Sequence, residues 1–132
     1  MPAAKQGDQV VSTDIHIVMV PPPGPGPLIP MPLPHPFTGI INGGLSPDVK
    51  IMGMPAAVVG SMADNTPPHI PTPPGVAFQR PPSNKATIVF GSLSVFINGQ
   101  MAARSADPAT TCNDPSDLPV GRVVASGTVM IG

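Results

Sequence analysis

The sequence has 132 residues, of which six are Lys or Arg and seven are acidic, for a formal net charge of −1. This balance gives no indication of a nucleic-acid or membrane-surface partner, and no apolar run reaches the ~18 residues of a membrane-spanning helix. Proline (22) and glycine (14) are as frequent as in disordered chains, yet only 10% of the residues are charged and the mean hydropathy is +0.22. We therefore expect a folded chain with an apolar composition of small residues.

Short segments rich in Val and Ile, bounded by Gly, Pro, Asn and Ser, predict β-strands. No segment keeps a 3.6-residue apolar period over three turns, so no helix longer than a single turn is expected. The predicted fold class is therefore all-β. In chain order the expected strands are 14–20, 49–53, 86–91, 95–99, 121–125 and 128–132.

Two proline-rich windows, 21–36 and 67–82, separate these strands and together hold sixteen of the 22 prolines. Because proline lacks a backbone N–H and fixes φ, we expect both windows to be polyproline-type loops rather than helices or central strands. Their similar placement predicts an architecture that extends long loops toward one end.

From the chain length we expect a single domain, 1–132, with no extension domain. A lone cysteine, Cys112, excludes an internal disulfide, and no charged and apolar leader opens the sequence. We expect a protein that is made in the cytoplasm without a signal peptide.

A motif ending in Ala-Ala recurs three times, and an Asp follows each copy. Glycine-ended strands precede the second and third copies, whereas the strand 128–132 has no copy after it and the first copy has no strand before it. Joining the two chain ends completes a third unit, so the sequence predicts three permuted units around one axis with adjacent termini. The copies are Pro2–Ala4 with Asp8, Pro55–Ala57 with Asp64 (three residues further on than in the other copies), and Met101–Ala103 with Asp107.

The sequence contains three histidines and one cysteine, His16, His35, His69 and Cys112. Their spacing matches no local zinc-finger pattern, and from spacing alone a solvated His or a buried free Cys is the commoner outcome. The repeat changes this expectation, because His16, His69 and Cys112 each follow the Asp of one unit. Three nitrogen ligands and one sulfur ligand suit tetrahedral Zn²⁺.

The opening Met-Pro-Ala-Ala, the Ala-Ala-Arg variant at 102–104, the glycine-ended strands and the proline-rich loops resemble the PAAR-repeat family. The resemblance covers the whole chain, although Lys5 and Val58 replace the motif's arginine. It implies a small cone-shaped, pseudo-threefold domain of short strands and hairpins. In that domain the long Pro-rich loops converge on an apical zinc held by three His and one Cys.

The resemblance also implies a function. PAAR-type tips cap and sharpen the trimeric VgrG-type spike of a contractile injection system, such as a type VI secretion system or a phage-tail-like particle. Such a tip is delivered outside the cell or into a target cell, aids membrane puncture through transient contact with the target membrane, and offers an attachment point for effector proteins.

Four protein ligands leave no open position for water, and the absence of Glu removes the usual metallohydrolase base. The zinc is therefore expected to be structural, and the chain is not expected to be an enzyme. Asp14 and Asp114, near the ligands in sequence, are expected to orient a histidine or to make a capping hydrogen bond. Two other function classes are open from the residues alone: a Pro-rich adaptor for SH3- or WW-type domains, and a small zinc hydrolase.

If the loops and the zinc form one end, the glycine-ended strands form the other. One chain with three similar faces could then meet a homotrimeric spike at a stoichiometry of one to three. The residues expected at this docking face are Ile51, Met52, Met54, Phe96, Ile97, Met130 and Ile131.

Overall fold

Strands and turns, without any helix, make up the structure, a computed structural model that describes residues 1–132. Six strands close into an antiparallel barrel, because the first and last strands in the order β1-β2-β5-β7-β10-β11 also pair with each other. The all-β prediction is confirmed. The barrel strands are β1 (Gln9–Val20), β2 (Ile29–Gly43), β5 (Met62–Asn65), β7 (Lys85–Ile88), β10 (Pro108–Thr111) and β11 (Leu118–Val124).

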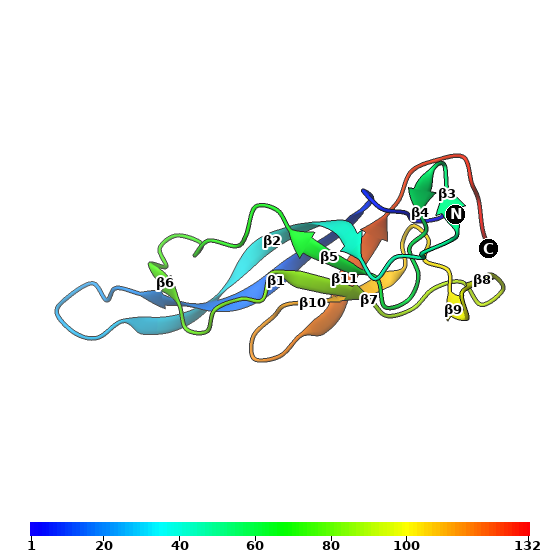
Figure 1. Cartoon of the computed structure of the whole chain (residues 1–132). Helices are drawn as coiled ribbons and strands as arrows, with labels where there is room; N and C mark the ends of the chain where they lie inside the picture. The colour runs from blue at the N-terminus through cyan, green and yellow to red at the C-terminus, as the bar shows by residue number, and fades with distance from the viewer.

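The remaining strands are short. β6 (Ala77–Phe78) adds to β1 outside the barrel. Two small hairpins lie at the wide end (Figure 1): β3 (Lys50–Ile51) with β4 (Met54–Pro55), and β8 (Phe96–Ile97) with β9 (Gln100–Met101).

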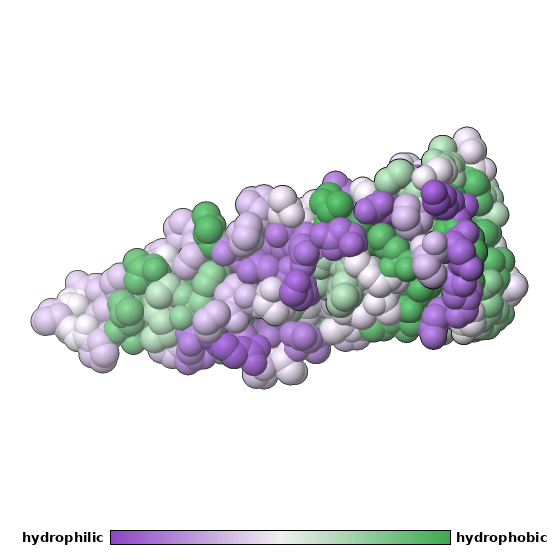
Figure 2. Space-filling model, viewed as in Figure 1, coloured by the Kyte–Doolittle hydropathy of each residue, from purple (hydrophilic) through white to green (hydrophobic).

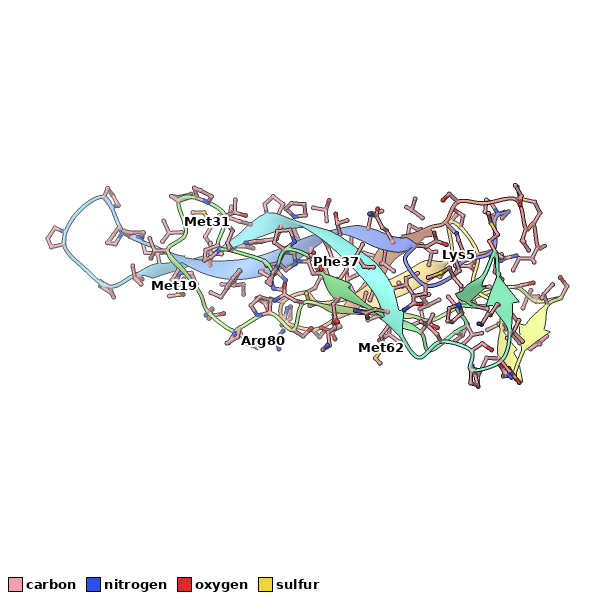
Figure 3. All side chains as sticks on the ribbon, turned by 45° about the horizontal axis from the view of Figure 1, so that its top comes forward. Lys5, Met19, Met31, Phe37, Met62 and Arg80 are labelled. Carbon is pink, nitrogen blue, oxygen red and sulfur yellow. The ribbon has the colours of Figure 1, made fainter.

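The molecule tapers from a wide end, where both termini lie, to a narrow end formed by the loop between β1 and β2 (Figures 1 and 2). Met19 and Met31 lie toward the narrow end, Phe37 near the middle and Lys5 at the wide end (Figure 3). The expected cone shape is confirmed. No helix in the structure has the length and hydropathy required to cross a membrane.

The first proline-rich window is only partly a loop, and here the prediction was wrong. Residues 29–36 continue β2 and pair with β1 as far as Val20↔Ile29. The prolines occupy every second position, 30, 32, 34 and 36. Even-numbered β2 residues direct their backbone groups away from β1, as shown by Thr38, whose N–H donates to Asn65 Oδ1 at 2.9 Å. The positions at which proline lacks a backbone N–H therefore all lie on the edge of β2 that does not pair with β1.

The Ala-Ala copies meet at one axis through a closed ring of backbone hydrogen bonds. The N–H of Ala4 donates to Ala103 O (2.9 Å), that of Ala103 to Ala57 O (3.0 Å), and that of Ala57 to Ala4 O (3.0 Å). All three residues have no exposed surface. Close approach of three backbones leaves room only for a small side chain, which explains the repeated alanine. The predicted arrangement of three units is confirmed.

The residue that ends the middle unit's motif is Ser61, not Asp64. The N–H of Lys5 donates to Asp8 Oδ2 (3.0 Å), and the N–H of Val58 donates to Ser61 Oγ (2.9 Å). Ser61 follows Ala57 by four residues, the same offset as Asp8 from Ala4, so this unit has no insertion. Asp64 instead lies on the surface of β5.

The chain ends complete the third hairpin. The N–H of Ile131 donates to Met1 O at 2.9 Å, and the Met1 ammonium donates to Ile131 O at 3.1 Å. The expected adjacency of the termini is confirmed. Each unit also begins with a Ser-x-x-Val segment whose valine carbonyl accepts the N–H of the first alanine of the motif. The three segments are Ser46–Val49, Ser92–Val95 and Ser126–Val129.

Candidate metal centre

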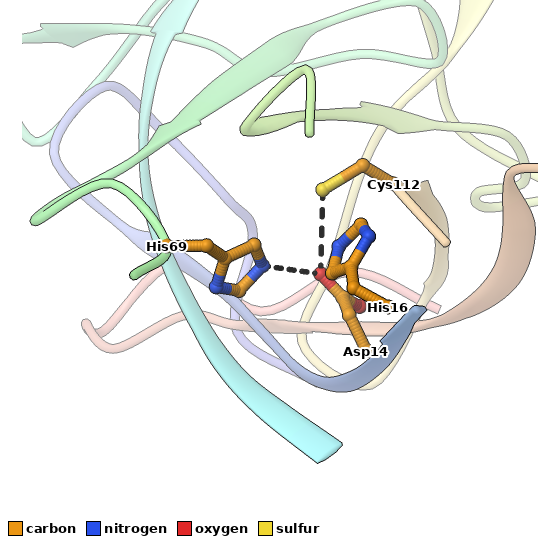
Figure 4. Close-up of side chains that lie close together, drawn as sticks. All are labelled: Asp14, His16, His69 and Cys112. Atoms are coloured by element: carbon orange, nitrogen blue, oxygen red, sulfur yellow. Dashed lines mark hydrogen bonds and ion pairs between the residues drawn. The ribbon is translucent and has the colours of Figure 1, made fainter. Parts of the chain in front are cut away.

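Four side chains that can ligate a metal converge at one place in the protein (Figure 4). Asp14 and His16 alternate on β1 and so face the same side of that strand. His69 comes from the segment between β5 and β6, and Cys112 follows β10. Each offers one ligand atom, and these atoms lie within 4.8 Å of one another. We call these four residues the cluster.

Asp14 lies at the centre of the cluster and has no exposed surface. Its Oδ2 is 3.0 Å from His69 Nε2 and 3.5 Å from Cys112 Sγ, whereas its Oδ1 accepts the hydroxyls of Thr111 (2.6 Å) and Ser12 (2.8 Å). Burial alone would raise the pKa of Asp14, but the hydrogen bonds from His69, Thr111 and Ser12 hold it below its ordinary value. The cluster therefore contains a buried carboxylate.

His16 carries an unsatisfied imidazole. Its side chain is buried, and neither ring nitrogen makes a well-formed hydrogen bond, because the Asp114 carboxylate approaches Nδ1 only to 3.4 Å. Burial lowers the pKa of His16, which keeps the ring neutral and leaves a nitrogen lone pair available near neutral pH. A buried polar atom without a partner is costly, and a metal ion is one way to satisfy it.

His35 lies beside the cluster but not in it. Its ring centroid is 5.4 Å from that of His16 and 5.5 Å from that of His69. Both of its nitrogens are engaged elsewhere: Nδ1 contacts Leu33 O at 2.8 Å, and Nε2 accepts the N–H of Thr72 at 3.1 Å. Of the four ligands predicted from the sequence, the structure brings His16, His69 and Cys112 together, with Asp14 in the fourth place.

Cys112 is a buried free thiol. Burial raises its pKa to about 11, so without a metal the sulfur is protonated at neutral pH. Zinc binds the thiolate, so metal uptake at this site would release the thiol proton.

Comparison with known families bears on this site. The family model described as PAAR motif matches residues 32–116. The chain belongs to the PAAR-motif family. No curated protein matches it. Membership in this family indicates a spike-tip protein of a contractile injection system. It also implies association with a spike protein. The family is structural rather than enzymatic.

Beside the cluster of this PAAR chain, Asp114 links His16 to the surface. Asp114 Oδ2 accepts the N–H of Ile17 at 2.9 Å and lies 3.4 Å from His16 Nδ1. Arg80, visible on the flank of the molecule in Figure 3, donates to Asp114 Oδ1 from Nε (3.1 Å) and from Nη2 (2.7 Å). Burial would raise the pKa of Asp114, but the Ile17 N–H and the Arg80 guanidinium hold it below its ordinary value. The arrangement can orient the His16 ring.

Two cavities border the site, and each is lined by a different set of residues. One, of about 310 Å³, is lined by His35, His69 and the prolines of 67–73. The other, of about 260 Å³, is lined by His16, Cys112 and Arg80 among others. Each therefore offers a route by which an ion could reach the cluster.

At the wide end, the residues predicted for docking divide by exposure. Met52 (54%), Phe96 (59%) and Met130 (61%) are well exposed, Met54 is exposed to a smaller extent, and Ile131 is half-buried. Ile51 and Ile97 are buried in a second apolar core beneath the hairpins, because they alternate with exposed neighbours on β3 and β8. They contribute to folding rather than to the surface.

Proposed function

We propose that this chain is a zinc-stabilised tip that caps and sharpens a trimeric VgrG-type spike, with one tip on each trimer. The ring of hydrogen bonds among Ala4, Ala57 and Ala103 carries this proposal, because it gives one chain three similar units about an axis. A pseudo-threefold object can seat on a homotrimer with each unit facing one subunit. The family match and the tapered shape support the same conclusion.

The wide end supplies the docking face in this proposal. Phe96 and Met130 occupy equivalent positions, each directly after the valine of its Ser-x-x-Val segment, and Lys50 takes that position in the remaining unit. Exposed apolar side chains at these two positions are typical of an interface that a partner covers. Methionine adapts to the shape of its partner, which suits docking onto three similar subunits.

Zinc is the metal we propose for the cluster, with His16, His69 and Cys112 among its ligands. Nitrogen and sulfur donors favour Zn²⁺, and a closed protein shell makes such an ion structural. The narrow half needs this support. Val18 and Val20 are buried there but lie outside the main apolar core of the barrel, so few apolar contacts hold the tip together.

The adaptor alternative loses much of its basis in the structure. Prolines 30–36 lie on β2, which is paired along its length with β1, so this segment is not a free polyproline ligand. Within the proposed function, the narrow end makes transient contact with a target membrane and the particle delivers the tip outside the cell or into a target cell. Effector attachment is also part of this proposal.

Reconstitution with a candidate trimeric spike protein from the same genome tests the proposal. We expect a complex of one chain with three spike subunits by native mass spectrometry, and one zinc per chain by elemental analysis. Absence of a complex, or a stoichiometry other than one to three, would contradict the capping function. Absence of metal from chain purified without chelator would contradict its zinc-stabilised form.

A further inference from the structure

We propose that each of the three equivalent sites on the spike has an apolar surface with a carboxylate at its rim, and that the ammonium of Lys50 pairs with one of these carboxylates. This inference rests on the capping function proposed above and concerns the chemistry of the spike surface that receives the tip. It follows from one position of the three hairpins at the wide end, which holds a cation in one unit and apolar side chains in the other two.

Lys50, Phe96 and Met130 take this position in the three hairpins, and all three are exposed. The residue opposite each of them on the paired strand is a half-buried proline or methionine. Residues directly opposite on antiparallel strands lie on one face, so every hairpin presents an exposed side chain beside an apolar one. The three positions are therefore equivalent in pairing and in exposure. The pairs are Lys50 with Pro55, Phe96 with Met101, and Met130 with Pro2.

Contacts between neighbouring units hold the hairpins in place. Asn98, two residues after Phe96, donates from Nδ2 to Asp48 Oδ1 at 2.9 Å and accepts the hydroxyl of Ser46 in the preceding unit. Gly132, two residues after Met130, accepts the hydroxyl of Ser92 through its carbonyl. Each of these hairpins is thus fixed to the start of another unit, and the base that meets the spike is a connected surface.

Lys50 is the one charged side chain of the three units, 46–61, 92–107 and 126–132 with 1–8, that has no partner within the chain. No ion pair of the structure includes it. A cation that the chain leaves unpaired on a docking face is available to a group of the partner. The other charged side chains are partnered: Lys5 with Asp8 (3.1 Å), Arg104 with Asp107 (3.0 Å) and Asp48 with Asn98 (2.9 Å).

A homotrimer offers the same site to each of the three units. A wholly apolar site would suit Phe96 and Met130, but it would leave the ammonium of Lys50 without a partner as the interface loses water, which is costly. One kind of site satisfies all three residues. Its apolar surface receives each side chain, the stem of the lysine included, and its carboxylate stays hydrated at the rim where no lysine meets it.

An exchange of two residues tests this inference. The double variant Lys50→Phe with Phe96→Lys moves the cation to another hairpin, which on a homotrimer is equivalent to turning the tip by one subunit. We expect its affinity for a candidate trimeric spike protein to stay within about 3-fold of the wild type. Loss of binding by this double variant, with an unchanged melting temperature, would overturn the inference.

Single variants separate charge from size. Phe96→Lys places a second cation opposite a free carboxylate, whereas Phe96→Glu places a like charge there. We expect Phe96→Lys to bind the spike at least about 10-fold more tightly than Phe96→Glu, because like charges at an interface repel. Equal affinities of these two variants would contradict a carboxylate at each site.

A third measurement uses the unaltered chain. Its association rate with the spike should fall by about 3- to 10-fold as the salt concentration rises from about 0.05 to 0.5 M, because salt screens the attraction. Lys50→Met should lose most of this dependence, and Lys85→Met, on β7, should keep it. A wild-type rate that does not change with salt would overturn the inference.

The outcomes distinguish this inference from the function on which it rests. If the wild-type chain forms no complex of one tip with three spike subunits, the capping function fails and this inference fails with it. If that complex forms but Lys50→Met keeps the full salt dependence, the inference alone fails and the capping function stands.

Discussion

Ala57 donates its N–H to the carbonyl of Ala4 at 3.0 Å, which joins two repeat units at the axis of the molecule. Neither side chain has exposed surface. Ala57→Val adds two methyl groups where three backbones meet, and overpacking of this kind costs about 1–3 kcal/mol. We expect a corresponding drop in the free energy of unfolding measured by denaturant titration. Ala77→Val, on the exposed strand β6, is the control and should change it by less than about 0.5 kcal/mol. Equal effects of the two substitutions would contradict the role of the ring.

Ala106 has a φ of +75°, where the equivalent positions hold Gly7 (+92°) and Gly60 (+98°). A side chain in this left-handed region costs about 1–2 kcal/mol, and the greater freedom of glycine in the unfolded chain offsets part of the gain on its removal. Ala106→Gly should therefore stabilise the protein by up to about 1 kcal/mol. Thermal unfolding checks this, and a lower melting temperature would contradict it.

Asp114 lies 3.4 Å from His16 Nδ1 and is fixed by Arg80. Removing the carboxylate charge with Asp114→Asn should weaken zinc binding by about 10- to 100-fold, as loss of such outer partners commonly does. Chelator competition measures the affinity. Lys85→Met, which breaks the exposed ion pair with Asp64, is the control and should leave zinc affinity unchanged. If both variants bind zinc like the wild type, Asp114 does not position His16.

The stability of the metal-free chain should fall on both sides of neutral pH. Burial lowers the pKa of His16 and His35 below 6.5, so the unfolded chain takes up protons more readily and stability is lost as the pH falls through 6.5. The lowered pKa of Asp14 adds a second loss as the pH falls below 3.8. The raised pKa of Cys112 acts in the opposite direction, so stability is lost as the pH rises from 9.0 toward about 11.

Melting temperatures of the metal-free chain across this pH range test these signs. We expect a maximum between pH 6.5 and 9.0. A metal-free chain that becomes more stable on acidification from pH 7 to pH 5 would contradict the assignment of neutral buried histidines.

The exposed apolar residues of the wide end should carry the contact with the spike. Phe96→Asp and Met130→Asp each place a charge at equivalent positions of that face, and loss of a central apolar contact costs about 2 kcal/mol of binding free energy. Spike binding should weaken while zinc content stays the same. Val76→Asp, at an exposed apolar residue beside β6, is the matched control. Wild-type binding by both wide-end variants would place the docking face elsewhere.

Much of this fold could be predicted from the sequence because its determinants are local. Glycine-ended strands and Ala-Ala steps predict three hairpin-based units, and the unpaired first motif predicts that the termini meet. The middle unit has Ser61 at the position that Asp8 occupies in the first unit, and this equivalence was missed. Serine and aspartate oxygens can accept the same backbone N–H, so the position does not require an Asp. The Ser-x-x-Val segments, such as Ser92–Val95, were a usable signal for the correct alignment of the units.

The candidate site was less predictable, since it depends on contacts distant in sequence. Proximity of His16, His69 and Cys112 followed from the repeat. The central place of Asp14 depends on its contacts with His69 and Cys112 across the barrel, although an Asp-x-His pair on a strand does place both side chains on one face. The engagement of His35 with Thr72 depends on where the segment after β5 runs, and no pattern in the sequence predicts that path.

The alternating prolines of β2 have a consequence for how tips behave at high concentration. A bare strand edge normally recruits another strand, because it offers both N–H donors and carbonyl acceptors to a passing chain. Along residues 30–36 the edge turned away from β1 offers no N–H donor, since each such position is a proline, and the carbonyl of Pro34 already accepts the hydroxyl of Thr72. A strand of a second molecule cannot form a regular hydrogen-bonded ladder with this edge, and neither can an unfolded segment of another protein. The narrow half can therefore present a long strand without the self-association that such an edge would otherwise invite.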